Sequence, residues 1–565
     1  MITRLEVDGV PALLAPADGP MHAGLVFRVG TADETLPVRG ITRLIEHLVT
    51  DGPGSTGPEH TYFHTRGTPT EIADFLSGVC AALRNPPADR IAAVRERMST
   101  VRDRDPMPMW RYGARSHGVA SYPEWALPGL TTDQIQDWIT RWFTRANAAL
   151  WVAGDEMPGE LRLDLPDGTR QPVPTAVTVL PATPAWFTGP DGTAGWDTVV
   201  RRDAGAAVFA TVLERRLQHE LCDRAGAAEK TRTEYEPRAD GTARILALAD
   251  AVTGRQDAAL GGLVDVLAAL RAGRIDSDEV GTVVKHTSEG LRDAECRGAR
   301  LPGQAFNLLA GRAVQTLDEA LAEVRAVTAE DVAGVASAAY DAGLLMTPGT
   351  GGADWAGYAP APTMSETVLD GRTHRGRGDR NLRLISGAQG ISVVEGDVVG
   401  TVRYDACAAV LAWPDGARQL IGEDAVMARV EPTLYRDAEQ VVHDVDQWIP
   451  ARLRIDMPPR DRDRIPQPRP AAAREEEPVE GGRPLVTLLL AGMATLFVVA
   501  GGLGVLTMML TQGPADDSGV LADLGEYGLV ASASILFGTF AGRIAVDAAV
   551  ELRRQQASRN PARPD

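Results

Sequence analysis

A long apolar segment near the C-terminal end restricts this chain more than any other feature of its sequence. Residues 484–510, PLVTLLLAGMATLFVVAGGLGVLTMML, are 27 consecutive residues without a charged side chain. A helix of that length can cross a hydrocarbon core of about 30 Å with some tilt. The segment is therefore predicted to be a transmembrane helix, and the residues before it to form a region tethered to a membrane.

A second apolar segment follows a short acidic connection. Residues 527–542 carry no charge, Tyr527 suits one membrane interface, and Arg543 can extend its guanidinium to the other. Three more apolar residues follow, so we expect a second transmembrane helix over 527–546, with a buried or interfacial helix as the alternative. Because arginine-rich sequence flanks the pair on both outer sides, the positive-inside rule predicts that both termini face the cytoplasm.

Composition limits the partners and the compartment. The formal net charge of -19 argues against a nucleic-acid partner, which would need clustered basic side chains to neutralise phosphates. Arginine exceeds lysine by 55 to 2, which we attribute to GC-rich bacterial coding, so the predicted location is a bacterial cell membrane. The four cysteines lack C-x-x-C spacing and are interpreted as buried thiols in a reducing compartment.

The region just before the membrane segments divides into a linker and a small domain. Residues 457–483 are rich in proline and in both charges, which is typical of an extended linker. Residues 363–456 contain short apolar runs separated by glycine or aspartate turns, with a hairpin at 414–416 and a closing helix over 436–449. The packed side of that helix is expected to hold Val441, Val442, Val445 and Trp448. We predict a small antiparallel β domain, similar in outline to a pleckstrin-homology-like fold, and outline alone assigns no ligand.

The first 350 residues show alternating helix and strand patterns. A strand is expected at 23–29 and a helix from near Gly40. Thr131 and Gln134 are spaced as a capping box for a helix with apolar residues at i, i+3, i+4 and i+7, and a strand follows at 147–155.

The same order of elements returns about 200 residues later in the run VTAEDVAGVASAAYDAGLLMTPG. A threonine, acidic residues, an apolar helical face and a short apolar strand recur in sequence. This favours two similar α+β domains at 1–175 and 190–350, and chance likeness of two amphipathic helices is the alternative.

Within the first of these predicted domains, the run GITRLIEHL at residues 40–48 comes one residue short of a known metal motif. The pattern H-x-x-E-H places two imidazoles and a carboxylate on one face of a helix, where they can hold zinc beside a general base. Glu46 and His47 fit this pattern, but Arg43 stands in the place of the first histidine.

Together with the preceding strand and glycine turn, this run resembles the insulinase and pitrilysin family of zinc peptidases, which includes the mitochondrial processing peptidase. The third metal ligand of that family is a glutamate 77 residues beyond the second histidine, and counting from His47 leads to Glu124. The resemblance covers residues 1–350 and implies two repeated α+β domains. It also implies that His47 and Glu124 would bind zinc and that Glu46 would act as the general base.

Two departures from the family pattern point to lost activity. Arginine stays protonated and offers no lone pair to a metal, so at most two protein ligands remain where catalytic zinc usually has three. The family also holds its substrate with an arginine and a tyrosine seven residues apart, and aligned positions here carry Cys222 and Glu229. We expect no substrate clamp, and we expect the Arg43 guanidinium to replace the metal charge beside Glu46 and Glu124.

Other histidines are interpreted as structural. His60 and His64 lie in a run that favours a strand, and His443 belongs to the closing helix of the β domain. His22, next to the first strand, could supply a ligand from another direction.

These patterns support a non-catalytic, membrane-anchored homologue of insulinase-family peptidases, acting as a regulatory or substrate-binding subunit without a cofactor. Its partner would be an active peptidase of that family or a second copy of itself. One alternative is an active zinc endopeptidase that degrades peptides at the membrane. Another is a scaffold or peptide-binding module of a membrane complex, so whether the chain is an enzyme stays open at this stage.

Overall fold

The structure is a computed structural model that describes residues 2–50, 54–98, 104–349 and 351–468. The predicted transmembrane helices at 484–510 and 527–546, and most of the predicted linker at 457–483, lie outside the described residues. Among the helices that are described, none combines the length and the apolarity needed to cross a membrane.

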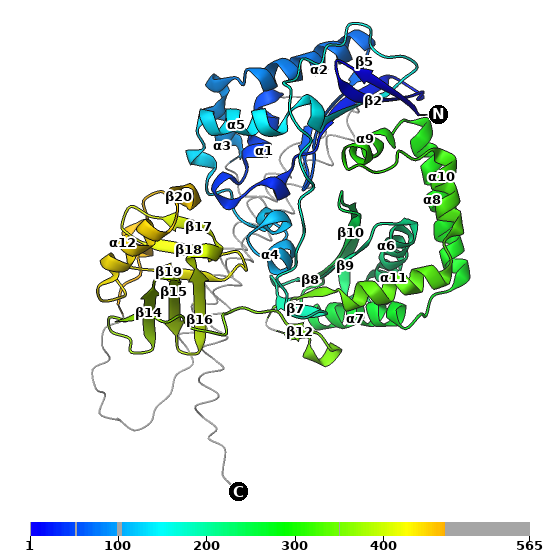
Figure 1. The fold of residues 1–565 in the computed structure, drawn as a ribbon. Helices are drawn as coiled ribbons and strands as arrows, with labels where there is room; N and C mark the ends of the chain where they lie inside the picture. The colour runs from blue at the N-terminus through cyan, green and yellow to red at the C-terminus, as the bar shows by residue number, and fades with distance from the viewer. Residues whose placement is uncertain (1, 51–53, 99–103, 350, 469–565) are drawn as a thin grey trace, which may run out of the picture.

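The first unit, residues 3–153, is built on a six-stranded sheet with the strand order β1-β2-β6-β3-β5-β4. Its strands are β1 (Thr3–Val7), β2 (Val10–Ala15), β3 (Met21–Phe27), β4 (Gly54–Thr56), β5 (Thr61–Gly67) and β6 (Ala148–Ala153). One face is covered by α1 (Ile41–Val49), α2 (Pro69–Arg84), α3 (Ile91–Met98) and α5 (Thr132–Trp142) (Figure 1). The predicted strands at 23–29 and 147–155 and the helix from near Gly40 are confirmed, as is the capping box at the start of α5.

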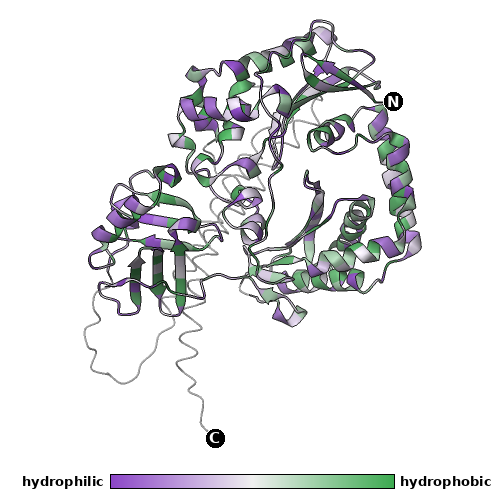
Figure 2. Cartoon of the chain, in the orientation of Figure 1, coloured by the Kyte–Doolittle hydropathy of each residue, from purple (hydrophilic) through white to green (hydrophobic). Residues whose placement is uncertain are grey.

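The second unit, residues 185–360, has a six-stranded sheet in the order β12-β7-β11-β8-β10-β9, which repeats the arrangement of the first sheet except at the edge strand β12. Its strands are β7 (Ala185–Thr188), β8 (Thr193–Arg201), β9 (Ala228–Pro237), β10 (Thr242–Ala251), β11 (Leu344–Thr347) and β12 (Ala359–Pro360). The helices packed on one face are α6 (Ala204–Leu217), α7 (Gln256–Arg271), α8 (Ser277–Cys296) and α11 (Ala329–Asp341), while α10 (Leu317–Ala326) lies against α8. Along α8, hydrophobic and hydrophilic residues alternate, as expected for a helix with one buried side (Figure 2).

Five strands of the two sheets correspond, and the sixth does not: the edge strand β1 precedes β2 and pairs with it antiparallel, whereas β12 follows β11 and pairs with β7 in parallel. In the first, β6 pairs with β2 in parallel and with β3 antiparallel; in the second, β11 pairs with β7 in parallel and with β8 antiparallel. The strands β6 and β11 each follow a helix that begins at a threonine capping box, α5 and α11 respectively. The likeness seen in the two sequence runs therefore has a counterpart in two equivalent helix–strand pairs.

Each sheet is covered on its second face by a short helix from the other unit. Helix α9 (Leu301–Leu309) of the second unit packs Leu301, Ala305 and Leu309 against the first sheet. Helix α4 (Met107–Tyr112) of the first unit packs Met107 and Trp110 against the second sheet. This exchange buries apolar surface on both faces of both sheets and joins the units.

The third unit, residues 372–456, consists of two four-stranded sheets and one helix. The first sheet contains β13 (Arg372–Arg375), β14 (Leu382–Gly387), β15 (Gly390–Glu395) and β16 (Val398–Arg403). The second contains β17 (Cys407–Ala412), β18 (Arg418–Gly422), β19 (Met427–Val430) and β20 (Arg454–Asp456), and α12 (Ala438–Trp448) closes the core. The predicted hairpin at 414–416 is confirmed as the connection of β17 to β18.

One prediction for the closing helix is wrong. Val441 and Val445 are buried as expected and Val442 is half-buried, but Trp448 is 55% exposed. Trp448 is the last residue of α12, and the chain turns there so that Ile449 takes the buried place. The indole instead stacks on the ring of Tyr404, with the ring centroids 6.3 Å apart.

Candidate functional site

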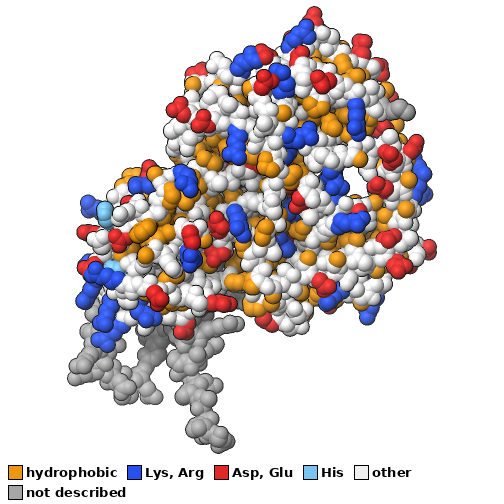
Figure 3. All heavy atoms as spheres, in the orientation of Figure 1, with side chains coloured by type: hydrophobic (Ala, Val, Ile, Leu, Met, Phe, Trp, Pro, Cys, Tyr) orange, Lys and Arg blue, Asp and Glu red, His pale blue; other side chains and the backbone are white. Residues whose placement is uncertain are grey.

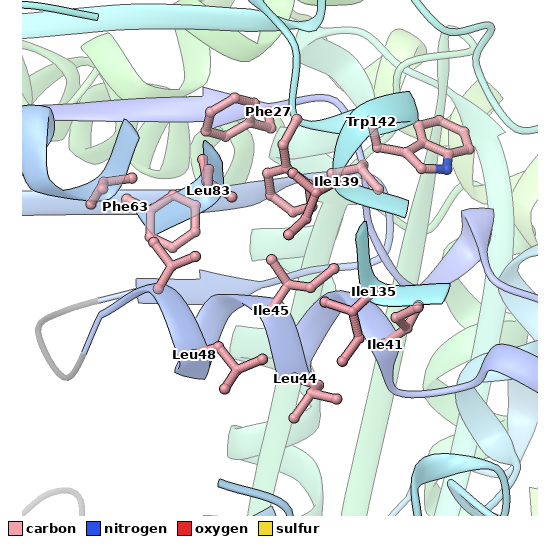
Figure 4. Packing of buried hydrophobic residues seen from close by; sticks show 14 of the residues in the cluster. Phe27, Ile41, Leu44, Ile45, Leu48, Phe63, Leu83, Ile135, Ile139 and Trp142 are labelled. Atoms are coloured by element: carbon pink, nitrogen blue, oxygen red, sulfur yellow. The ribbon is translucent and has the colours of Figure 1, made fainter. Parts of the chain in front are cut away.

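Helix α1 carries its charged residues and its apolar residues on different sides. Ile41, Leu44, Ile45 and Leu48 are all buried in the core of the first unit; Ile45 points toward the sheet and α5, whereas Leu44 and Leu48 extend from the other side of α1 (Figure 4). Arg43, Glu46 and His47 lie at i, i+3 and i+4, the spacing that brings side chains together on a helix. The sequence therefore places these three side chains on one face.

The start of α1 is held by Glu34, a residue that the sequence patterns did not indicate as part of the site. Its carboxylate accepts hydrogen bonds from the backbone N–H groups of Gly40 (2.9 Å) and Thr42 (3.0 Å). It also pairs with the Arg39 guanidinium at 2.8 Å. A buried carboxylate at the positive end of a helix satisfies otherwise unpaired N–H groups and fixes the direction of the helix. The sequence feature that could have identified Glu34 is an acidic residue in the segment that leads to the Gly40 turn.

Glu124 reaches the same place from the loop before α5, and it is held by arginine. Arg43 donates a hydrogen bond to Glu124 Oε2, and Arg39 Nη1 lies 3.9 Å from Glu124 Oε1. Gly40 has a φ of +94°, and a Cβ there would lie 2.9 Å from the Glu124 carboxyl carbon. The glycine thus leaves room for the carboxylate to lie across the start of α1.

Glu46 is buried and turned toward the edge strand of the first sheet. The hydroxyl of Thr56 in β4 donates to Glu46 Oε2 at 3.0 Å. A Cβ on Gly54 of the same strand would lie 2.9 Å from Glu46 Oε1, so the glycine makes space for the carboxylate. His47 is more open, with 38% of its side chain exposed and its Nδ1 4.0 Å from Glu46 Oε1.

These donors fall short of what a catalytic zinc site needs. Arg43 cannot ligate a cation, and its guanidinium engages the carboxylate of Glu124, the residue that the family resemblance predicts as a ligand. Within the described ranges, no three His, Cys, Asp or Glu side chains gather in a way that could hold a metal ion. The arrangement can form charge-assisted hydrogen bonds, but it offers no three-ligand set for zinc.

His22 belongs to another side of the molecule. Its Nε2 lies 3.2 Å from His64 Nδ1, and its ring packs edge-on against Trp151. Trp151 belongs to the sheet face covered by α9, whereas Ile45 of α1 packs on the opposite face. The first sheet therefore separates His22 from Glu46, and His22 is not placed to complete a site there. His60 also serves packing, against the rings of Tyr62 and Phe306.

The positions aligned with the family's substrate clamp lie in the second unit. Cys222 is half-buried in the π-helical extension of α6, residues Gln218–Arg224. Glu229 is exposed in β9, the edge strand of the second sheet. A thiol and a carboxylate cannot replace an arginine and a tyrosine as donors to a peptide backbone.

The histidine pair predicts a specific dependence of stability on pH. Burial lowers the pKa of His22 to about 4, helped by Arg66 and His64, and burial followed by Arg66 lowers the pKa of His64. The unfolded chain, with histidine pKa values near 6.5, therefore binds more protons than the folded chain below that pH. The stabilising effect of the neutral pair is complete above pH 6.5 and is lost as the pH falls toward 4, at up to about 1.4 kcal/mol per pH unit for each proton.

Urea unfolding of the wild type and of the double variant His22→Asn, His64→Asn at pH 7.5 and pH 5 measures this effect. The wild type is expected to lose more free energy of unfolding between the two pH values than the double variant. His443→Asn, at an exposed position of α12, should keep the wild-type dependence. Equal losses in wild type and double variant would contradict the prediction.

Comparison with known proteins identifies the fold. No protein-family model and no curated protein sequence matches the chain. Among solved structures, a protease from Helicobacter pylori aligns with a TM-score of 0.51 and 14% identity, over 62% of this chain and 99% of that one. The peptidase M16 inactive domain from Pseudomonas fluorescens aligns with a TM-score of 0.52 and 14% identity, over 64% of this chain and 100% of that one.

A chain of complex III from Candida albicans gives similar values, with a TM-score of 0.52, 13% identity, and coverage of 62% and 96%. Identities this low show a shared fold and nothing more. The expected fold is confirmed at that level: the chain is a mixed α+β protein with several sheets, and it has the fold of M16-type peptidases, the insulinase and pitrilysin type.

Proposed function

We propose that this protein is a non-catalytic homologue of M16-type peptidases that keeps the fold of the family and uses an ion pair in place of the metal centre. The observation that carries the proposal is the bond from Arg43 to Glu124, because the residue in the place of the first ligand binds the carboxylate in the place of the third. Both side chains are nearly buried, with 11% and 12% of their surface exposed. A charged pair so shielded from water stabilises the local structure without a cation.

In this role the chain is a regulatory or substrate-binding subunit, and its partner is an active peptidase of the same fold or a second copy of itself. The fold is shared with a structure described as an inactive M16 domain and with one described as a protease, so this fold occurs both with and without activity, and the proposed pairing rests on the family resemblance. Anchoring to a bacterial membrane through residues 484–510 and 527–546 belongs to the same proposal and rests on their apolar sequence. A zinc endopeptidase and a scaffold module are the competing functions.

Restoring the ligand tests the proposal. The variant Arg43→His should acquire zinc, since it places an imidazole at i, i+4 from His47 and releases Glu124 from its guanidinium partner. Metal analysis of the purified full chain should find a stoichiometric zinc in Arg43→His and none in the wild type. The double variant Arg43→His, Glu124→Gln should lose the metal again.

A matched control is Arg141→His, which makes the same change at an exposed position of α5 and should bind no zinc. Stoichiometric zinc in the wild type, lost in Glu124→Gln, would establish the zinc endopeptidase instead. Unchanged zinc content in Arg43→His would remove the argument that Arg43 replaced a ligand.

A further inference from the structure

Exposed arginines gather on the edge of the third unit where β13 and β14 meet. Residues 372–383 contain five arginines and one aspartate, in a chain whose formal net charge is -19. All five arginines are exposed. In the space-filling view, blue side chains crowd the lower left corner, over the part of the third unit that carries β14 (Figure 3).

Three arginines form a row across neighbouring backbone segments. Arg375 of β13 is the cross-strand partner of Arg383 in β14. On the other side of β13, the backbone N–H of Arg436 donates to the carbonyl of Arg375 at 3.1 Å, next to the antiparallel bridge between Gly376 and Tyr435. Cross-strand partners project from the same face of a sheet, so the three guanidinium groups share one face. We call Arg375, Arg383 and Arg436 the arginine row.

Within the part of the chain that the structure describes, no acidic side chain neutralises this like-charge row. Among the described residues, no carboxylate lies within ion-pair distance of the row, although Arg372 nearby pairs with Asp437 at 3.1 Å. Like charges at directly opposed strand positions destabilise a sheet. An anion bound at the row would replace the repulsion between the arginines with attraction to the anion. Guanidinium groups favour phosphate because they can donate two parallel hydrogen bonds.

The position of the row in the chain indicates which phosphate-bearing molecule it would meet. The hydroxyl of Thr433, three residues before Arg436, donates to the carbonyl of Pro466 at 2.6 Å. The described chain ends two residues later at Pro468, and the apolar segment begins 16 residues beyond it at Pro484. Sixteen residues span at most about 55 Å, so this connection limits how far the row can lie from the membrane surface at Pro484, where the proposed anchor begins. The tether also raises the effective concentration of that surface at the row.

From this geometry we infer that the arginine row binds the anionic phospholipid headgroups of the membrane in which the chain is anchored. The inference rests on the proposed membrane anchor for the identity of the surface. The acidic remainder of the molecule is repelled by the same headgroups, so the row sets the orientation of the peptidase-like units above the bilayer.

The full chain in lipid nanodiscs tests this inference by hydrogen exchange of the segments 372–383 and 434–437. We expect slower exchange in discs that contain phosphatidylglycerol than in discs of phosphatidylcholine alone, and loss of the difference at high salt. The variant Arg375→Gln, Arg383→Gln, Arg436→Gln should show no difference between the lipids. The corresponding triple lysine variant, which keeps the charge, should retain the difference.

A control with the same change in charge is Arg4→Gln, Arg201→Gln, Arg325→Gln, at exposed positions of the first two units, and it should behave as the wild type. Equal exchange of the wild type in both lipids would overturn the inference. Protection in both lipids that disappears when Glu475, Glu476, Glu477 and Glu480 become Gln would assign the row to the chain's own acidic segment. Arginine-dependent binding of a DNA or RNA duplex without a response to lipid would assign it to nucleic acid.

Failure of the full chain to enter nanodiscs would reject the anchor separately. Sedimentation of that protein with phosphatidylglycerol vesicles, with and without the triple Gln change, would then test the row. Cosedimentation that depends on the three arginines would support headgroup binding. Its absence would overturn the inference.

Discussion

Replacing Asp197 with asparagine is expected to destabilise the protein by about 3–5 kcal/mol, the usual cost of leaving buried charges without a partner. Asp197 is fully buried in β8. Its carboxylate accepts hydrogen bonds from Arg111 (2.5 Å to Nη2) and from Arg244 (2.8 Å to Nε). Arg244 also bonds Asp105 at 2.5 Å. Since Arg111 and Asp105 come from the first unit, this network joins α4 to the second sheet.

The pKa of Asp197 follows from the same contacts. Burial alone would raise it, but Arg111 and Arg244 outweigh burial and hold the pKa below its ordinary value. The carboxylate therefore contributes stability that is complete above the unfolded pKa of about 3.9 and is lost as the pH falls through the lower folded pKa. At neutral pH the full contribution is present, so urea unfolding near pH 7 should show the whole effect of Asp197→Asn.

Two further variants separate charge from packing. Asp250→Asn, at an exposed position of the same sheet, should change the free energy of unfolding by less than about 0.5 kcal/mol. The triple variant Arg111→Met, Asp197→Leu, Arg244→Met should recover much of the loss, because it removes all three buried charges together. An Asp197→Asn protein as stable as the wild type would show that the network contributes nothing to the joint between the units.

Replacing Gly113 with alanine is expected to displace the third unit from the first. Gly113 has a φ of +70°, and a Cβ there would lie 1.9 Å from the backbone carbonyl oxygen of Glu423. The next residue, Ala114, donates its N–H to that same carbonyl at 2.9 Å. A side chain at position 113 must therefore break this bond, and the backbone strain alone costs about 1–3 kcal/mol.

Limited proteolysis and thermal unfolding measure this displacement. Gly113→Ala should be cleaved faster between 361 and 371, the connection to the third unit, and its Tm should fall. Gly129→Ala is the matched control, because no atom lies within 4 Å of a Cβ at that exposed glycine. Cleavage of Gly113→Ala at the wild-type rate would show that the contact between Gly113 and Glu423 does not hold the units together.

The contact at Gly113 bears on the candidate site because the third unit lies beside it. Ala409, Leu411 and Ile421 of the third unit belong to the same apolar core as α1. Strand β17 packs against the turn Leu36–Val38 that leads into α1. Loss of the third unit should therefore loosen the start of α1, where Arg43 meets Glu124.

Much of the local structure was predictable because it depends on residues close in sequence. Capping boxes and the apolar stripe of α5 need only neighbouring residues, and the strands of the third unit follow from short apolar runs between turns. The exposure of Trp448 was not predictable in this way, since a helical stripe does not show at which residue the helix ends.

In the candidate site as well, some features were predictable from the sequence and others depended on the folded chain. Arg43 is unable to ligate a metal wherever it lies, so its effect on a metal site follows from the sequence alone. The family resemblance also predicted that Arg43 lies beside Glu124, 81 residues away in sequence, and the structure places the two in a hydrogen bond. Glu34 and Arg39 complete the arrangement through contacts that no spacing rule predicted.

The sequence by itself determined several local elements, such as the helix with the Thr131 capping box and the strand that follows it, and the presence of an arginine where the H-x-x-E-H pattern has its first histidine, because periodicity and side-chain chemistry are local properties. Tertiary structure decided that α4 and α9 cover each other's sheets, that His22 faces away from Glu46, and that Arg375, Arg383 and Arg436 form one row. These relations join residues far apart in the chain, and their energies depend on which surfaces are buried against each other once the chain has folded.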